Sequence, residues 1–479
     1  MKYYSTRDRR KAIPAKEAIF RGPADDGGLY VPEYIPSFSF EDYLHASYSE
    51  LACAVLETFF EDFDASYLKE SAQAAYKEFD RDNAVGYTEL GDVTVAELFH
   101  GPTAAFKDFA LQMLPYLMKE SAAGRKVRIL TATSGDTGKA ALAGFKDVEN
   151  TDIFVFYPAN GVSTMQKRQM TTQEGENVHV YGIDGNFDDA QRTVKEMFQD
   201  DALREEGRAS GIEFSSANSI NIGRLVPQIV YYIYSYLELV RRGTIEMGET
   251  VDICVPTGNF GNILASMYAK RMGLPFGQFI CASNKNHVLT DFINTGVYDT
   301  HRDFYKTTSP SMDILVASNI ERYLQLILKR DEKVKEKMDE LKERGRFDIP
   351  VDLIRRSKLV GYWTTDAEGE ARIKDVFERY GYLMDPHTAV AYDGVKKHAS
   401  PRHVLLMATA SPYKFPETVA DALNLPKEED TEALLREIEK VSSEPIPKAL
   451  EEVFRKPERF KESIKIDEMP LVVKEGFDD

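Results

Sequence analysis

The sequence predicts an α/β fold built on parallel strands. Two observations support this prediction. Short runs rich in apolar and β-branched residues alternate with helical segments of ten to twenty residues, and the alternation continues over most of the chain. Strands of this kind that are separated by helices are typical of βαβ units, whose parallel sheets are buried on both faces. No internal repeat is visible, which excludes solenoids and propellers.

The expected strands follow one another in a clear order. They are VRILTAT (127–133), IFVFYP (153–158), VHVYGI (178–183), IEFSSAN (212–218), VDICVPT (251–257), FGQFICAS (276–283) and VLLMATA (404–410). An Ala-rich helix follows the first strand, and further helices are expected at 163–174, 188–199, 221–241, 262–272 and 387–398.

Two helical segments differ from the rest in composition. The segment 221–241 is apolar and aromatic on all sides, which favours either a core helix or a subunit contact. The segment 318–346 ends in KRDEKVKEKMDELKERGR and is expected to be a charged surface helix. Residues 1–95 carry mixed signals and are predicted to form a small N-terminal α+β module. Residues 426–479 are predicted to form an acidic helical tail that packs outside the main fold.

Composition excludes several classes of protein. The chain has 479 residues, 43% of them hydrophobic, so it is long enough for two or three folded domains and too apolar to be disordered. Its net charge of −18 argues against a nucleic-acid partner but not against a small anionic substrate. Three scattered cysteines favour buried thiols in a reducing compartment. The charged N-terminus and the lack of a long apolar run predict a cytoplasmic protein with no membrane partner.

Several common motifs are missing from the sequence. There is no GxGxxG after a first strand, no GxxxxGK[ST], no HExxH and no GxSxG. The eight histidines do not have the spacing of metal ligands, so no metal site is predicted. Nicotinamide, P-loop and zinc chemistry are therefore disfavoured.

Two strand-to-helix turns could bind anions. They are ATSGDTGKAA (132–141) and PTGNFGNIL (256–264). At such a turn, free backbone N–H groups and the positive end of the helix dipole converge, and Gly258 and Gly261 would let a phosphate approach closely. Both turns lie where ligands bind in α/β sheets, at the carboxyl ends of strands. Each turn could equally be an ordinary helix cap.

Lys107 is a candidate nucleophile. It stands in LFHGPTAAFKDFA (98–110), and an apolar setting lowers the pKa of a lysine. The alternative is a lysine at the rim of an amphipathic helix. A lysine of this kind and two anion-binding turns are the minimal parts of a pyridoxal phosphate site. Thr409 could donate a hydrogen bond to the ring nitrogen of that cofactor.

Long motifs in register give the chain a family resemblance. They are YYSTR (3–7), DGGLYVPE (26–33), ELFHGPTAAFKDFA (97–110), ATSGDTG (132–138), QMTT (169–172), SSANSINIGRLVPQ (215–228), PTGNFGNILA (256–265), SPSMDILVASNIER (309–322), DPHTAVAY (385–392) and ATASPYKF (408–415). With these motifs the chain resembles the threonine synthases, of the tryptophan-synthase-β-like class of pyridoxal phosphate enzymes. The resemblance covers about residues 1–425, and the tail adds little to it.

The resemblance implies an architecture. It implies two mostly parallel twisted sheets flanked by helices in a catalytic region at 96–425, beside the N-terminal module. A smaller subdomain would occupy about residues 130–225, and the remainder would form a larger subdomain with a helical insertion at about 295–350. The resemblance leaves the choice between a monomer and a homodimer open.

It also implies roles for thirteen residues. Lys107 would be the Schiff-base lysine and proton shuttle, and Thr409 would face the pyridine nitrogen. The cofactor phosphate would be held by Gly258, Asn259, Phe260, Gly261 and Asn262. The substrate carboxylate and the ring edge would meet Ser134, Asp136 and Thr137. The substrate phosphate would be held by Asn218, Ser219 and Arg224. The family more usually shows His at the position of Ser411 and Ala at that of Tyr413, which puts the pocket shape in question.

The implied reaction converts O-phospho-L-homoserine and water to L-threonine and phosphate by γ-elimination and β-addition. The alternatives are another lyase on the same fold, such as a serine/threonine dehydratase or a phospho-amino-acid lyase, and a non-catalytic relative. The second alternative predicts a damaged lysine or phosphate turn, and both are intact.

Overall fold

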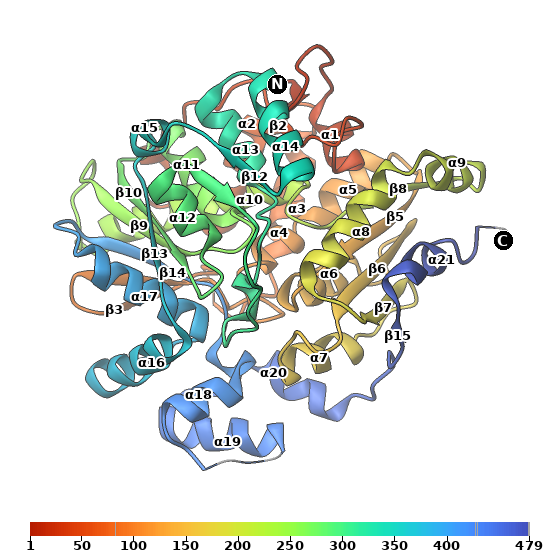
Figure 1. Cartoon of the computed structure of the whole chain (residues 1–479). Coiled ribbons are helices and arrows are strands. Elements are labelled where there is room, and N and C mark those ends of the chain that lie inside the picture. Colours follow the sequence, from red (N-terminus) through yellow and green to blue (C-terminus); the bar gives the residue numbers. More distant parts are fainter. Residues whose placement is uncertain (82, 427, 429, 478–479) are drawn as a thin grey trace.

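Two sheets made mostly of parallel strands form the centre of the molecule (Figure 1). The computed structural model describes residues 1–81, 83–426, 428 and 430–477. The larger sheet has the order β13 (Leu359–Trp363), β10 (Phe276–Ser283), β9 (Val251–Pro256), β14 (Val404–Ala408), β4 (Val93–Glu97) and β3 (Gly86–Glu89). Only the pair of β3 and β4 is antiparallel within this sheet.

The smaller sheet is parallel throughout. Its order is β15 (Ser463–Ile464), β7 (Val178–Ile183), β6 (Thr151–Pro158), β5 (Lys126–Ala132) and β8 (Ile212–Ser216). The predicted fold class, with two mostly parallel sheets flanked by helices, is therefore confirmed.

Helices cover both sheets. Around the larger sheet lie α10 (Ile222–Arg241), α11 (Gly261–Met272), α12 (Val288–Thr295), α16 (Asp366–Tyr380), α17 (Pro386–His398) and α18 (Pro416–Ala422). Around the smaller sheet lie α4 (Asp108–Leu111), α5 (Leu114–Ala122), α6 (Asp136–Phe145), α7 (Thr164–Thr171), α8 (Phe187–Gln199) and α9 (Asp201–Ala209). The helix predicted as a core element or a subunit contact is α10, and its residues from Ile222 to Leu237 are all buried within the chain. It is therefore a core helix.

The N-terminal residues pack against both halves of the molecule. Their elements are β1 (Tyr3–Ser5), α1 (Ala15–Arg21), β2 (Tyr30–Pro32), η1 (Phe40–Tyr43), α2 (Tyr48–Phe59) and α3 (Ala65–Tyr76). Helix α2 packs on α10, and α1 packs on α5 and β8. The strands β3 and β4, which begin before residue 96, belong to the larger sheet. Every residue of β4 is buried, as expected for a strand that lies inside a sheet between β14 and β3.

The insertion at about 295–350 contains two helices where the sequence predicts one. Its elements are β11 (Val297–Asp299), η2 (Pro310–Met312), α13 (Ile320–Leu328), α14 (Asp331–Arg344) and β12 (Arg346–Asp348), followed by α15 (Val351–Arg356). Lys329 adopts the left-handed conformation, with φ of 55°, and ends α13. The first helix is largely buried, whereas only Val334 and Met338 are buried in the second. The sequence pattern of 318–346 is dominated by charged residues, so it does not indicate that the helix is interrupted at Lys329.

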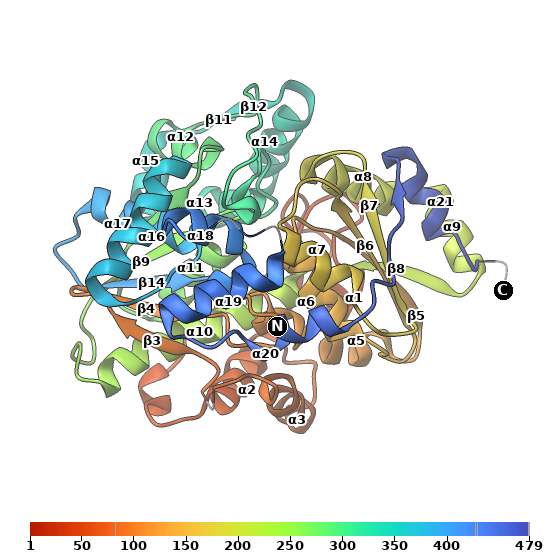
Figure 2. The ribbon, with the colours of Figure 1, turned by 90° about the horizontal axis from the view of Figure 1, so that it is seen from below.

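The C-terminal tail is part of both halves of the molecule. After η3 (Pro412–Lys414) and α18, its elements are α19 (Thr431–Ser442), α20 (Lys448–Glu451), η4 (Glu452–Arg455), β15, η5 (Ile466–Glu468) and α21 (Met469–Val473). Figure 2 shows it in blue, running from α19 past α7 to α21 at the smaller sheet. The buried Arg128 of β5 donates hydrogen bonds to the carbonyls of Val473 and Glu475. The tail therefore does not pack outside the fold, because β15 completes a sheet edge.

Two further features concern the described part of the chain as a whole. None of its helices is long and apolar enough to cross a membrane. Cys53, Cys254 and Cys281 are free and buried.

The packing of α21 gives a test of this architecture. Met469 is fully buried, whereas Leu471 on the same helix is 64% exposed. We expect Met469→Ala to lower the free energy of unfolding by about 2–4 kcal/mol, because it leaves a cavity, and Leu471→Ala to change it by less than about 0.5 kcal/mol. Urea unfolding of both variants measures the difference. Equal midpoints would contradict the integration of the tail into the fold.

Candidate active site

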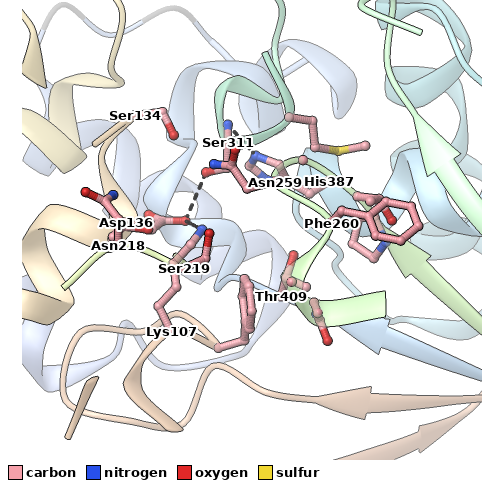
Figure 3. Close-up of a pocket in the computed structure, with 18 of the residues that line it drawn as sticks. Lys107, Ser134, Asp136, Asn218, Ser219, Asn259, Phe260, Ser311, His387 and Thr409 are labelled. Carbon is pink, nitrogen blue, oxygen red and sulfur yellow. Dashed lines mark hydrogen bonds and ion pairs between the residues drawn. The ribbon is translucent and has the colours of Figure 1, made fainter. Parts of the chain in front are cut away.

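All thirteen residues singled out in the sequence line one cavity between the two sheets (Figure 3). They come from strand ends and helix starts, which is where ligands bind in α/β folds. Figure 3 shows Lys107 reaching toward Asp136, with Thr409 beside its base and Ser311 and His387 on the far wall. The other lining residues, which the sequence did not single out, are Phe106, Ala132, Phe187, Gln228, Pro256, Thr257, Ser311, Met312 and His387.

Lys107 is held at the start of α4 by the end of β14. The backbone N–H of Phe106 donates to the carbonyl of Thr409 (2.9 Å), and the carbonyl of Lys107 accepts from Leu111. The lysine side chain is only 12% exposed, and its Nζ lies 3.8 Å from Oδ2 of Asp136. Burial lowers the pKa of Lys107 to about 8, against the opposing effect of the Asp136 carboxylate. A lysine in this state can react as a neutral amine near physiological pH.

Asp136 stands at the first position of α6 and is almost fully buried. Its Oδ1 accepts from Nζ of Lys414 and from Nε2 of Gln166, both at 2.8 Å. Its Oδ2 accepts from Oγ of Ser311 at 3.2 Å. Burial alone would raise the pKa of this carboxyl, but Lys414 and Lys107 hold it well below its usual range. Asp136 is therefore ionised, and it lies beside the amine of Lys107.

The turn after β9 presents free donors to the cavity. Phe260 has φ of 65° and directs the chain into α11. Within the described residues, no backbone N–H between positions 258 and 263 donates a hydrogen bond; the first to do so is Leu264, to Phe260. Gly258 is required here, because a Cβ atom would lie 2.5 Å from the carbonyl oxygen of Ser311. The turn can therefore bind an anion, and no acidic side chain of the described residues competes for its N–H groups.

Asn262 adds a side-chain donor to the same turn. Its Oδ1 accepts from the hydroxyls of Tyr231 and Tyr232, both at 2.6 Å. Its Nδ2 is buried and has no partner among the described residues. An unpaired buried amide is costly, so it indicates a ligand atom at this position. Asn259 instead holds the neighbouring segment, because its Oδ1 accepts a hydrogen bond from the N–H of Ser318 and its carbonyl accepts one from the N–H of Asn319.

Arg224 lies in the first turn of α10 and is 3% exposed. One N–H of Nη1 donates to the carbonyl of Ala217 (2.9 Å), while the buried Nε has no partner in the described part of the chain. No carboxylate of the described residues forms an ion pair with it. Burial lowers the pKa of Arg224 to about 10, so the guanidinium stays charged. A buried, uncompensated guanidinium is strongly unfavourable unless an anion completes the site.

Asn218 has a different arrangement from the one that the resemblance implies. Its Nδ2 donates to the carbonyl of Ala132 (2.6 Å), and its Oδ1 accepts from the N–H of the same residue (3.0 Å). Its amide thus fixes the end of β5 and leaves one N–H for any other partner. The hydroxyl of Ser219, in contrast, has no hydrogen-bond partner among the described residues, while its carbonyl accepts from Asn319 and Arg322.

Three further hydroxyls face the cavity without partners. Ser134, Thr137 and Thr409 line it, and their side chains donate no hydrogen bond to any described residue. These hydroxyls are available to a ligand, as the resemblance implies.

Four residues that act on this site were not singled out from the sequence. Ser311 and His387 line the cavity, and Gln166 and Lys414 lie behind Asp136. Nε2 of His387 accepts from the N–H of Ser311 (3.1 Å), and its Nδ1 donates to Asp385 (2.7 Å). The histidine thus fixes the segment that packs over Gly258. Each of the four stands in or beside a motif of the resemblance, but no single motif shows what it contacts.

The two departures from the family pattern do not reshape the cavity. Neither Ser411 nor Tyr413 lines it. Oγ of Ser411 accepts from the N–H of Tyr413, and the hydroxyl of Tyr413 donates to the carbonyl of Glu444 in the tail.

Three family models match the chain. The model described as "Threonine synthase N terminus" matches residues 2–76, "Pyridoxal-phosphate dependent enzyme" matches 88–410, and "Threonine synthase, C-terminal" matches 388–469. The chain belongs to the threonine synthase family of pyridoxal-phosphate-dependent enzymes. The third match reaches residue 469, so the prediction that the resemblance ends near residue 425 is wrong.

Individual relatives agree with this assignment. "Threonine synthase-like 1" of Homo sapiens is 40% identical in an alignment of 449 positions that covers 88% of this chain and 60% of that protein. The threonine synthase of Pseudomonas aeruginosa is 39% identical and is covered over 90% of its length. A crystal structure of pyridoxal-phosphate-bound threonine synthase from Brucella melitensis has a TM-score of 0.86 and 36% identity over 99% of each chain. The chain thus spans three fifths of the human relative and nearly all of the bacterial ones.

The state of Lys107 can be measured directly. We expect its reaction with acetic anhydride, followed by mass spectrometry in the cofactor-free chain, to rise with pH and to reach half its maximum near pH 8, because only the neutral amine reacts. Lys107→Met must abolish the labelled peptide signal. A midpoint above pH 10 would contradict the burial of the amine beside Arg224.

Proposed function

We propose that the chain is a threonine synthase, which binds pyridoxal phosphate and converts O-phospho-L-homoserine and water to L-threonine and phosphate. One observation carries the choice of a phosphorylated substrate. Arg224 is a buried guanidinium without a carboxylate partner among the described residues, and it lines the same cavity as Lys107. A dianionic phosphate would satisfy its free N–H groups and its charge.

The chain's donors fit the cofactor. Lys107 would hold its aldehyde, Thr409 would meet the ring nitrogen, and the turn at 258–262 would bind its phosphate through backbone N–H groups and Nδ2 of Asn262. When bound, pyridoxal phosphate supplies an aldehyde that links to the substrate amino group and a ring that withdraws electrons from the substrate carbons.

Separate parts of the cavity would bind the two anionic ends of the substrate. The hydroxyls of Ser134 and Thr137, near the N-terminus of α6, would bind the carboxylate, and Asp136 would lie at the ring edge. Arg224 and Ser219, near the N-terminus of α10, would bind the phosphate. We assign Asn218 to positioning, because its amide holds Ala132.

Lys107 is the group that would move protons. With a pKa of about 8, about a tenth of its amine is neutral at pH 7. Its Nζ can therefore accept a proton from the substrate α-carbon and return it later. In the net reaction, the bond between the γ-carbon and the phosphate oxygen breaks, and water supplies the hydroxyl group at the β-carbon.

Substrate choice tests the proposal. We expect phosphate release and L-threonine formation from O-phospho-L-homoserine, and at least about 100-fold lower kcat/KM for L-serine and L-threonine, which cannot use Arg224. Lys107→Ala should abolish both products, because no other lysine of the described residues lines the cavity. Preference for O-phospho-L-serine would favour a phospho-amino-acid lyase, and preference for L-serine or L-threonine would favour a dehydratase.

The role of Arg224 has its own test. We expect Arg224→Met to raise the KM for O-phospho-L-homoserine roughly 30-fold or more, because a buried charge-assisted contact contributes 2 kcal/mol or more. Binding of L-threonine, followed by the absorbance of the bound cofactor, should change little. Arg241→Met, on the last turn of the same helix, is the matched control. An equal loss for the phosphorylated and the unphosphorylated ligand would make Arg224 purely structural.

A further inference from the structure

Lys414 is a fully buried lysine for which the proposed mechanism has no use. Its Nζ lies 2.8 Å from Oδ1 of Asp136 and donates to the carbonyl of Thr103 at 2.9 Å. Its side chain has no exposed surface and does not line the cavity. Lys414 therefore cannot touch a ligand in this structure, and whatever it does must pass through Asp136.

The two oxygens of Asp136 face different partners. Oδ1 faces the ammonium of Lys414 and the amide of Gln166, both at hydrogen-bond distance. Oδ2 faces the cavity, where Ser311 donates at 3.2 Å and Nζ of Lys107 lies at 3.8 Å. The ammonium of Lys414 is thus 1.0 Å closer to the carboxylate of Asp136 than the amine of Lys107 is. The strongest contact of the carboxylate lies on the side away from the reactive lysine.

Lys414 is itself fixed in place by several elements. It ends the short helix η3, and its N–H donates to the carbonyl of Ser411. Its carbonyl accepts from Oγ of Ser163, which caps the helix that carries Gln166. The same segment therefore positions both donors to Oδ1. An ammonium held so closely cannot move to another acceptor without local rearrangement.

We propose that Lys414 is a positioning residue that holds Asp136 by Oδ1 and neutralises it, so that Lys107 faces a carboxylate already paired with another cation. The inference extends the proposed function, because it concerns the lysine on which that function depends. It makes Lys414 one of the groups that, together with burial and Arg224, keep the amine of Lys107 reactive.

The charges around Lys107 explain why this pairing matters. Its charged neighbours are Asp136 on α6, Asp385 at the start of α17, Arg224 on α10 and Lys414 on η3. The two acids favour the charged amine, and the two cations disfavour it. Removing Lys414 leaves two acids against one cation, and Lys107 would be the only lysine in the described part of the chain that pairs with Asp136. Lys107 would then hold its proton more tightly.

Replacement of Lys414 by a neutral side chain of similar length tests the inference. In Lys414→Met we expect the midpoint of Lys107 acetylation, measured by mass spectrometry in the cofactor-free full chain, to move up by about one pH unit or more. At pH 7 this corresponds to a tenfold or greater fall in labelling rate. The absorbance of bound pyridoxal phosphate should show a pH-dependent change displaced in the same direction. Lys414→Gln, which keeps a donor but not the charge, carries the same expectation if Lys414→Met does not fold.

Two further variants separate charge from packing. Gln166→Met removes a neutral donor from the same oxygen of Asp136, and we expect it to move the Lys107 midpoint much less than Lys414→Met does. The double variant Asp136→Asn/Lys414→Met removes both charges, and it should return the midpoint to the wild-type value or below it, because Asp136 acts on the amine of Lys107 more strongly than Lys414 does. A merely structural role would not give this reversal.

The outcomes decide the inference without reference to turnover. An upward shift in Lys414→Met that the double variant reverses supports it. An unchanged midpoint in a folded Lys414→Met or Lys414→Gln protein overturns it, and so does a shift of equal size in Gln166→Met. Because labelling needs neither substrate nor cofactor, these results hold even if O-phospho-L-homoserine proves not to be the substrate.

Discussion

The buried ion pair between Asp136 and Lys414 joins the two sheets of the molecule. Asp136 is the first residue of α6, which follows β5 of the smaller sheet, and Lys414 lies just beyond β14, a central strand of the larger one. Lys414 is fully buried and Asp136 almost fully buried, so each charge is unfavourable without the other. The cavity therefore exists in its present form only while the two halves keep this relation. The segment at 309–312, which touches Asp136 from the large-sheet side, adds a second link.

The N-terminal residues support the proposed phosphate end of the cavity in a comparable way. Arg322 is fully buried, and it donates to the carbonyls of Tyr30, Ser219 and Ile220. The carboxylate of the neighbouring Glu321 accepts hydrogen bonds from Nε and Nη2 of Arg7. The loop before α10 is thus held by carbonyl contacts to the N-terminal segment and the insertion. The carbonyls of Ser219 and Ile220 are therefore occupied, and Ser219 stays in place at the wall of the cavity.

Much of the site was predictable from the sequence because its residues lie in short contiguous motifs. Glycine and asparagine at the end of an apolar strand, as in the turn at 256–264, indicate an anion-binding turn. Lys107, Asp136 and Thr409 stand near the ends of predicted strands or in motifs of the resemblance, which predicts that they lie together. The roles of Lys414 and Gln166 were not predictable, because both depend on contacts with Asp136. Lys414 is 278 residues away from it in the sequence, and Gln166 is 30 residues away. For Asn218 the motif predicted a role that the contacts of its side-chain amide only partly match. Its motif marks it as a binding residue, but its geometry is set by the backbone of Ala132.

The same distinction applies to the fold. The βαβ alternation is a local signal and gave the sheets, whereas the break at Lys329 and the two-residue strand β15 are decided by tertiary packing.

Strand β15 also bears on the order in which the chain can fold. It pairs with β7, made some 280 residues earlier, and Arg128 receives its carbonyl partners only from residues 473 and 475. Until residues 463–475 are made, the smaller sheet therefore has an open edge at β7, and Arg128 has Asp152 as a partner but neither of its two carbonyl acceptors. The last step in the assembly of this sheet has to wait until residues 463–464 have been made. Until then, the unpaired edge on this half of the molecule is open to chaperones and to aggregation.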